Sequence, residues 1–396
     1  MSDKSFAEVA MEMSGKSQEE SSSIGQIDSA DDDVELLFQK KHQTRNSPAY
    51  KAVWDQKFPS KEFFDNFTTD NTHRATLINC LETVKTHKKH GTLYENGKLS
   101  NSLLSDLAQC GYFGLLVPLP DKPAISFSEF APFISEMALL EPSVAGLASV
   151  HGCIGSVDPI KTFGSDDQKS KWLPMLASGE RLSAFALTEP CAGSDMTALE
   201  TYAVRDGNDY VLNGRKLFIT NATYGRLVSV VCLVDNHHHR SPQILLVDLP
   251  ATDTDTFHIE SYGLHALKKL HNNALVFTDH RVPRDNLIRL DKGNGLTVAY
   301  HGLNLGRVSL CANASGCMRS MLDSMLPWAK YRKTNGDEIG NRELVQSRIG
   351  ILSSYILSCD ALVSWCSSLI DEGYRGELEC IVAKNFGSEC QKEAAI

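Results

Sequence analysis

The spacing of apolar residues changes twice along this chain. From residue 47 to residue 182 apolar side chains recur mostly at every third or fourth position, as one buried face of a helix requires. A helix is predicted within residues 103–116, where Gly111 and Gly114 break it. A second is predicted at residues 128–140 and ends at Glu141-Pro142, because a proline disfavours helical backbone before it. The helical spacing returns beyond Gly295. The pattern therefore predicts helical regions on both sides of a non-helical middle.

The middle region alternates with a period of two, which is typical of strands. Residues 209–212 and 215–219 flank Asn213-Gly214, a dipeptide that suits the positive φ angles of a two-residue hairpin turn. Further strands are predicted at residues 227–234, 243–247 and 274–278. We therefore expect a mainly antiparallel β domain from residue 185 to about residue 290.

A long apolar stripe marks the last helical region. Its members alternate steps of four and three residues: Val345, Ile349, Leu352, Ile356, Cys359, Val363, Cys366 and Ile370. Such a seam is typical of a bundle helix and needs other helices to cover it. Because only about three helices fit between residues 297 and 396, the bundle is expected to be incomplete.

Together these patterns predict an α+β multidomain protein with a helical, a β and a second helical part. The expected parts are a disordered acidic tail over residues 1–45, an N-terminal α-helical domain over 46–184, a central antiparallel β domain over 185–295 and a C-terminal helical domain over 296–396. The tail is rich in serine and acidic residues, so it is expected to bury too little apolar surface to offset its chain entropy. The total of 396 residues exceeds the usual size of one core.

Charge and cysteine content narrow the function. A net charge of -10 without clustered Lys and Arg argues against nucleic-acid binding, so small molecules or a second copy are the expected partners. The 11 scattered cysteines favour a reducing compartment. The sequence predicts no membrane span and no secretory signal, and its acidic start is unlike a mitochondrial transit peptide. A cytoplasmic location is expected, with the mitochondrial matrix as the alternative.

Two short segments carry the candidate chemistry. The first reads FALTEPCAGSD over residues 185–195, and the second reads KLFITN over residues 216–221. Small residues in the first segment allow close approach of its backbone, while its Thr and Ser supply hydroxyls. In the second, strand alternation places Phe218 and Thr220 on one face, and Leu217 and Ile219 on the other. An aromatic ring beside a hydroxyl suits a flavin.

Taken together, the two segments and their flanks resemble the acyl-CoA dehydrogenase family, most closely its very-long-chain branch. The resemblance implies FAD bound by Phe185, Leu187, Thr188, Gly193, Ser194, Phe218, Ile219, Thr220, Arg332 and Thr334. In it Phe218 packs against the isoalloxazine, and the Thr220 hydroxyl reaches flavin N5. Residues 332–336 resemble the segment that reaches the flavin diphosphate of a neighbouring subunit, which implies a homo-oligomer, a dimer or a tetramer. Ser194, Asn304 and Arg307 would contact acyl-CoA.

The implied reaction is α,β-desaturation of an acyl-CoA thioester in fatty-acid β-oxidation, with electron transfer flavoprotein as the electron acceptor. The catalytic base stays unassigned: some subfamilies carry a glutamate where this chain has Gly306, and the other family position lies in a C-terminal segment beyond Ile396. The chain is therefore expected to be an incomplete copy of a longer dehydrogenase. Residues 150–155 and 383–389 look closest to the very-long-chain branch, which favours a long acyl group.

Three other functions stay open. An acyl-CoA oxidase would pass electrons to oxygen, a flavin monooxygenase would use the same scaffold, and a non-catalytic relative would only bind flavin or acyl-CoA. No metal is expected: His237-His238-His239 suggests one, but adjacent residues of a turn point in different directions, so a solvated loop is favoured.

Overall fold

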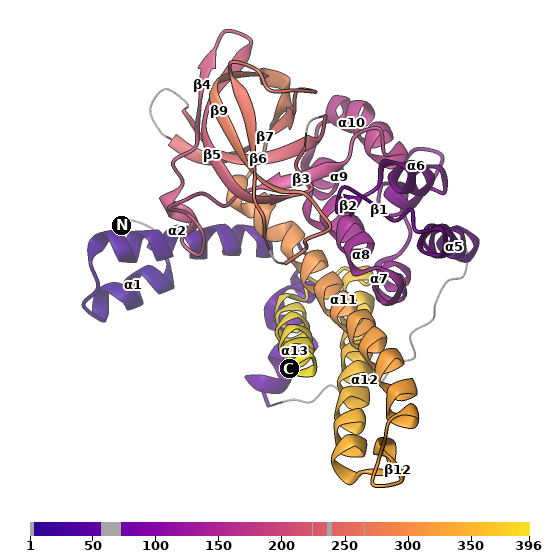
Figure 1. The fold of residues 1–396 in the computed structure, drawn as a ribbon. Coiled ribbons are helices and arrows are strands. Elements are labelled where there is room, and N and C mark those ends of the chain that lie inside the picture. The colour runs from indigo at the N-terminus through magenta and orange to yellow at the C-terminus, as the bar shows by residue number, and fades with distance from the viewer. Residues whose placement is uncertain (1–3, 57–72, 224, 236–239, 265) are drawn as a thin grey trace. The chain divides into compact units, whose positions relative to one another are not determined.

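The computed structural model describes residues 4–56, 73–223, 225–235, 240–264 and 266–396 (Figure 1). The chain divides into two compact units. The first comprises Met1–Gln39, Val117–Pro123 and Val150–Leu303, and the second comprises Lys40–Leu116, Ala124–Ser149 and Asn304–Ile396.

The first unit contains the whole sheet. Its helices are α1 (Phe6–Met13), α2 (Gln18–Glu35), a π-helical turn (Val150–Ile154), α9 (Val157–Phe163), α10 (Asp166–Ser178) and the start of α11 (Gly295–Tyr331). Its strands are β3 (Ser183–Ala186), β4 (Tyr202–Asp206), β5 (Asp209–Thr220), β6 (Leu227–Asp235), β7 (Arg240–Asp248), β8 (Phe257–Ser261), β9 (Asn272–Pro283) and β10 (Leu287–Ile288). The strands follow the order β10-β7-β6-β4-β5-β9-β8, and β3 pairs with β6.

The sheet is mainly antiparallel, as predicted. Only β3 and β4 run parallel to a neighbour, and both pair with β6: β3 through Ser183–Ala186, and β4 through Tyr202–Val204. Successive side chains of β6 point to opposite faces of the sheet and pack into two different hydrophobic cores. Val228 and Val230 belong to a cluster within the sheet, whereas Leu227 and Val231 belong to a cluster that also includes Trp172 and Leu176 of α10. The sheet is thus covered by helices on one side (Figure 1).

One predicted turn is wrong. β4 and β5 are joined by Gly207-Asn208, and Asn213-Gly214 lies inside β5. The β5 register against β9 shifts next to Gly214, whose φ is 141°, and a Cβ there would lie 2.5 to 2.7 Å from Thr201. This glycine therefore marks a bulge and a close approach of Thr201, not a turn.

The N-terminal segment also differs from the expected disordered tail, because α1 and α2 occupy most of it. Ser5 caps α1 by accepting from the Glu8 amide, and Ser17 forms a capping box with Glu20 at the start of α2. Ala30 of α2 is 1% exposed and joins the helix-side core of the sheet. Two of the serines that suggested disorder, Ser5 and Ser17, act here as helix caps.

The second unit is mostly helical. Its helices are α3 (Pro48–Val53), α5 (Arg74–His90), α6 (Asn101–Gln109), α7 (Phe127–Leu140), α8 (Pro142–Ser149), the rest of α11, α12 (Glu343–Asp371) and α13 (Glu377–Ala395). Two small hairpins complete it: β1 (Tyr94–Glu95) with β2 (Lys98–Leu99), and β11 (Lys333–Thr334) with β12 (Asp337–Glu338). The helix predicted at 128–140 is confirmed by α7, and the one predicted within 103–116 is α6, which ends at Gln109 before the left-handed Gly111, the predicted break.

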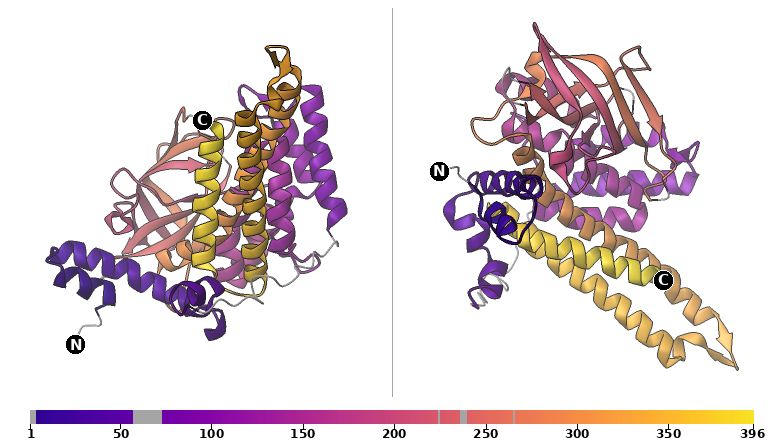
Figure 2. Two further views of the ribbon diagram at one scale, coloured as in Figure 1. Left: turned by 90° about the horizontal axis from the view of Figure 1, so that it is seen from below. Right: turned by 90° about the vertical axis from the view of Figure 1, so that its left-hand side faces the viewer.

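The predicted stripe on α12 is confirmed by burial. Leu352, Ile356, Cys359, Val363 and Cys366 are all buried. Figure 2 shows α11, α12 and α13 running side by side, and polar contacts between α11 and α12 agree with this view: an ion pair joins Arg319 to Asp360, and Ser315 donates to Asp360. Within the described residues α12 is also the one helix with the length and composition of a membrane span, a test that core helices of soluble proteins pass too.

Candidate functional site

The first motif is a tight loop that follows β3. The Glu189 amide donates to the Ala192 carbonyl at 2.9 Å, and the Ala192 amide donates back to the Glu189 carbonyl at 3.3 Å. Both of these residues are buried, whereas Gly193 and Ser194 are exposed. A Cβ added at Gly193 would meet no heavy atom within 4 Å, so its backbone faces open space. The loop therefore offers main chain and a hydroxyl to a ligand.

Three other predicted residues of this motif lie at the edge of the core. Phe185 and Leu187 are half-buried and pack against the helix-side core of the sheet, and Thr188 is also half-buried. Phe185 is part of β3, and Leu187 and Thr188 follow the end of that strand. Their side chains are therefore partly covered by the protein and could line one side of a ligand-binding pocket.

The second motif contains a bulge centred on Phe218. Phe218 has a φ of 59°, although it is an aromatic residue in a strand, and the pairing of β5 with β9 is interrupted between Lys216 and Ile219. The side chain is 51% exposed, and its ring centroid lies 5.6 Å from that of Tyr262. Left-handed backbone is unfavourable for a bulky residue and is concentrated at functional sites.

An asparagine of β9 holds the bulge in place. Asn272 Nδ2 donates to the Phe218 carbonyl at 3.1 Å and to Thr220 Oγ1 at 3.0 Å. Asn272 Oδ1 is buried and has no hydrogen-bond partner within the part of the chain that the structure describes. Neither the sequence spacing nor the resemblance singled out Asn272, because its role depends on the register of β9 against β5.

The predicted alternation of the second motif holds only in part. Phe218 is exposed and Thr220 is half-buried, while Ile219 is 3% exposed and belongs to the core within the sheet. The side chain of Ile219 therefore packs inside the protein, and only its backbone could reach a cofactor. Lys216 is also buried, although in a regular strand it would lie on the same face as the exposed Phe218. The bulge between the two residues separates them onto different faces.

A buried ion pair that the sequence analysis missed joins the two motifs. The Lys216 ammonium, 0% exposed, contacts the Glu189 carboxylate at 2.5 Å and donates to the Leu187 carbonyl at 2.9 Å. Burial lowers the pKa of Lys216, and Glu189 partly offsets this. Burial raises the pKa of Glu189, but the neighbouring Lys216 outweighs this effect, and the pKa lies below its usual value. The Leu217 amide also donates to the Thr188 carbonyl at 2.8 Å. The two motifs therefore form one assembly.

This assembly fits a flavin ring by its chemistry. It offers an exposed aromatic ring at Phe218, hydroxyls at Thr220 and Ser194, open backbone at Gly193 and an unsatisfied amide oxygen at Asn272. A planar group with apolar faces and polar edges needs this combination. A separate hollow of about 500 Å³, lined by Phe163, Trp172 and Arg289 among others, shares no residue with the two motifs.

The predicted acyl-CoA residues of α11 lie in the second unit and form a network of their own. Asn304 Nδ2 donates to the Arg375 carbonyl at 2.9 Å, and Arg307 Nη1 donates to Asn304 Oδ1 at 2.7 Å. Arg307 Nη1 also lies 3.2 Å from Glu377 Oε1. Asn304 is 7% exposed and therefore positions Arg307, which keeps a half-buried guanidinium. Gly306 between them is buried and carries no carboxylate.

Arg332 and Thr334 belong to the β11–β12 hairpin region of the second unit, and Arg332 lies at its base, directly after α11, where its carbonyl accepts from the Ile339 amide. β11 and β12 are joined by Asn335-Gly336, and both of these residues have positive φ angles, 52° and 81°. Arg332 and Thr334 are exposed, and Thr334 accepts from Arg342 through its carbonyl at 2.6 Å. Arg332 is thus exposed at the junction of α11 and the hairpin. Its predicted contact with the flavin of a neighbouring subunit stays a prediction.

The remaining sequence expectations add no site. The histidines at 237–239 lie outside the described residues, and the described residues contain no group of three His, Cys, Asp or Glu side chains that could hold a metal. Within residues 150–155, a Cβ at Gly155 would lie 2.3 Å from Ser183 Oγ and 2.7 Å from the Val150 carbonyl oxygen, so packing accounts for this glycine.

Comparison with known proteins covers most of the chain. The N-terminal, middle and C-terminal domain profiles of the acyl-CoA dehydrogenases match residues 73–180, 184–280 and 293–396. The three matches follow one another in the helical, β and helical order of the structure. Residues 1–72 lie outside them.

Individual relatives agree with these profiles. An acyl-CoA dehydrogenase of Bacillus subtilis is 29% identical over 297 residues, which cover 73% of this chain and 77% of that protein. A probable acyl-CoA dehydrogenase of the same species is 30% identical over 312 residues, which cover 78% and 80%. The very long-chain specific mitochondrial enzyme of Macaca fascicularis is 29% identical over 356 residues, and the chain spans only 52% of its length.

Solved structures show the same fold. A glutaryl-CoA dehydrogenase from Mycobacterium smegmatis in complex with FADH2 has a TM-score of 0.73 and 24% identity, over 85% of this chain and 84% of that one. An acyl-CoA dehydrogenase from Bacillus anthracis complexed with FAD has a TM-score of 0.67 and 23% identity, over 84% of this chain and 62% of that one. On the three profiles and on the relative that is 30% identical, this chain belongs to the acyl-CoA dehydrogenase family.

Proposed function

We propose that this protein is an FAD-dependent acyl-CoA dehydrogenase that removes hydrogen from the α and β carbons of an acyl-CoA thioester. Membership of the family makes it an oxidoreductase. The observation that carries the proposal is Phe218, an aromatic ring held half exposed on left-handed backbone beside the first motif. Such a position costs free energy, and strained positions of this kind cluster at functional sites.

FAD is the cofactor that the FAD-containing neighbours and the geometry of the two motifs support. When bound, it supplies a ring that accepts a hydride. Phe218 would pack against a face of that ring. Because Asn272 donates to Thr220 Oγ1, the Thr220 hydroxyl keeps its own proton to donate to the cofactor. The open backbone at Gly193 and Ser194 would leave room for phosphate and thioester groups.

The reaction also needs a carboxylate that removes the α proton and donors that polarise the thioester carbonyl. Gly306 cannot be that base, so we propose that the carboxylate comes from another position. Arg307, positioned by Asn304, is the proposed contact for the negative charge of acyl-CoA. Glu377 now neutralises Arg307, so substrate binding would compete with this ion pair.

The finer assignments rest on sequence likeness. We propose a long-chain substrate in fatty-acid β-oxidation, supported by 29% identity to the very long-chain specific enzyme. We also propose electron transfer flavoprotein as the acceptor, a dimer or tetramer in which Arg332 reaches a neighbouring subunit, and a cytoplasmic location. The exposure of Arg332 at the base of the β11–β12 hairpin supports the subunit contact.

An anaerobic titration tests the proposal. The purified chain is reconstituted with FAD, freed of excess cofactor and mixed with acyl-CoA esters of increasing chain length, while the flavin absorbance is followed. Bleaching of the flavin by long-chain acyl-CoA is expected. A chain that retains no flavin would overturn the proposal. Bound flavin that acyl-CoA does not bleach would point to a monooxygenase or a non-catalytic relative, and stoichiometric hydrogen peroxide in air would indicate an oxidase.

A further inference from the structure

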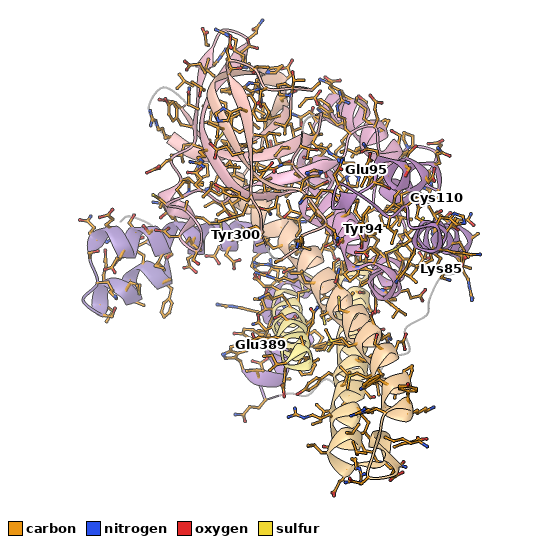
Figure 3. All side chains as sticks on the ribbon, viewed as in Figure 1. Lys85, Tyr94, Glu95, Cys110, Tyr300 and Glu389 are labelled. Carbon is orange, nitrogen blue, oxygen red and sulfur yellow. The ribbon has the colours of Figure 1, made fainter. Side chains whose placement is uncertain are left out.

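Two cysteines from different helices meet in the second unit. Cys80 lies on α5 and is 0% exposed, while Cys110 caps the C-terminal end of α6 and is half-buried. Their sulfur atoms lie 3.2 Å apart. Figure 3 marks Cys110 at the point where α6 comes next to α5, the helix that carries Lys85. A disulfide needs about 2.05 Å between its sulfurs, so a shift of roughly 1 Å separates the two thiols from a bond.

The surroundings of Cys110 favour its thiolate. The pKa of Cys110 falls to about 7, because the hydrogen bond from Cys80 lowers it most, burial partly opposes this, and the Thr83 hydroxyl and the Tyr112 backbone lower it further. A thiolate is the form that attacks peroxides and disulfides. Cys110 is thus an activated thiol on a partly exposed residue, and the Cys80 sulfur lies 3.2 Å away.

We propose that Cys80 and Cys110 form a reversible disulfide when the protein meets a hydroperoxide. The Cys110 thiolate attacks one peroxide oxygen, the O–O bond breaks, and hydroxide leaves, so Cys110 becomes a sulfenic acid. Cys80 then attacks the Cys110 sulfur, an S–S bond forms, the S–O bond breaks, and the departing hydroxide takes the Cys80 proton. Two thiols are oxidised and one peroxide is reduced to two waters. Two molecules of a small thiol then reduce the Cys80–Cys110 disulfide to the two cysteine thiols and become a disulfide themselves.

A second pair comes near this combination: the hydrogen bond from Cys311 lowers the pKa of Cys359, but both of these side chains are 0% exposed. Burial raises the pKa of Cys232 to about 12, and Cys153 is 0% exposed. Burial is also the main reason why the pKa of Cys317 rises to about 11. Cys191 is exposed on the first motif, so it can react with alkylating reagents or cross-link two copies. It is therefore the position to remove in a control background.

The experiment uses the full chain with Cys191→Ser, exposed to about one equivalent of hydrogen peroxide at neutral pH. Remaining thiols are blocked with iodoacetamide, and peptides are identified by mass spectrometry. We expect a Cys80–Cys110 cross-linked peptide that dithiothreitol removes. The proposal is overturned if Cys110 proceeds to sulfinic acid without a cross-link, or if it stays reduced while other cysteines are oxidised.

Two variants separate the roles of the sulfurs. In Cys80→Ala no cross-link can form, and we expect the Cys110 sulfenic acid to accumulate and react with dimedone. The pH midpoint for alkylation of Cys110 should also rise, since the donor from Cys80 is lost, and this readout does not require a disulfide. In Cys110→Ser, Cys80 should resist peroxide. Alkylation of Cys110 that is unchanged in Cys80→Ala, or rapid oxidation of Cys80 in Cys110→Ser, would each contradict the proposal.

Discussion

Replacing Lys216 with methionine should destabilise the fold by about 3 kcal/mol. Breaking a buried ion pair by removing one partner typically costs 3–5 kcal/mol, because it leaves a buried charge without compensation. Here the Glu189 carboxylate would keep its bonds from the Glu200 amide at 2.6 Å and the Thr201 amide at 3.2 Å. These two amide donors stabilise part of the negative charge of Glu189, so we expect a loss at the lower end of the roughly 3–5 kcal/mol range. The Leu187 carbonyl would lose its donor as well.

Urea unfolding, followed by circular dichroism, measures this loss against a matched control in the same strand. Arg215→Met breaks the ion pair between Arg215 and Glu260, in which the Arg215 side chain is 45% exposed and the Glu260 side chain 41%. Because this pair is exposed, its loss should lower the free energy of unfolding by less than about 1 kcal/mol. Adding Glu189→Gln to Lys216→Met should recover part of the loss, because the double variant buries no charge. The reasoning is refuted if Lys216→Met is no less stable than Arg215→Met.

Three further variants test other features. Phe218→Ala should weaken FAD binding by roughly tenfold, about 1.4 kcal/mol, with little effect on stability, since the ring is 51% exposed; fluorescence titration and urea unfolding measure the two effects separately. Gly214→Ala should lower the free energy of unfolding by about 2 kcal/mol, because its Cβ would lie within 2.7 Å of Thr201, and an equally stable variant would count against the bulge. Burial raises the pKa of Asp158, but neighbouring cations outweigh it and hold the pKa at about 2, below the 3.8 of the unfolded chain. Its contribution of about 2 kcal/mol should therefore be complete above pH ~4 and vanish as the pH falls to ~2, and this slope should be missing in Asp158→Asn.

The order of the helical and β regions could be predicted because hydrophobic periodicity reflects burial directly. In β6 alternate residues enter two different cores, and in α12 the stripe of Leu352, Ile356 and Cys359 is the buried face. The candidate site was predicted through resemblance, which identified Phe218, Gly193 and Ser194. No periodic signal marks these residues, since all three are exposed in part.

What the sequence could not predict depends on contacts between distant segments. Asn-Gly occurs three times in a β context, with two outcomes, and Asn96-Gly97 is a positive-φ turn between β1 and β2. Asn335-Gly336 forms a two-residue turn with both φ angles positive, whereas Asn213-Gly214 lies inside a strand because Thr201 approaches Gly214. A dipeptide preference states which backbone is allowed, and the tertiary neighbour decides which one is used.

Lys216 shows the same limit at the site itself. A lysine in an alternating segment is normally assigned to the solvent side, because a buried ammonium is costly without a partner. Its partner, Glu189, lies in a loop that had been interpreted only as a cofactor motif. Once the two are paired, the loop of the first motif is fixed to β5, and the bulge that follows Lys216 is what lifts Phe218 out of the core. The exposed ring and the buried lysine are therefore two consequences of one irregularity in β5, and the ion pair fixes the loop of the first motif beside that irregularity.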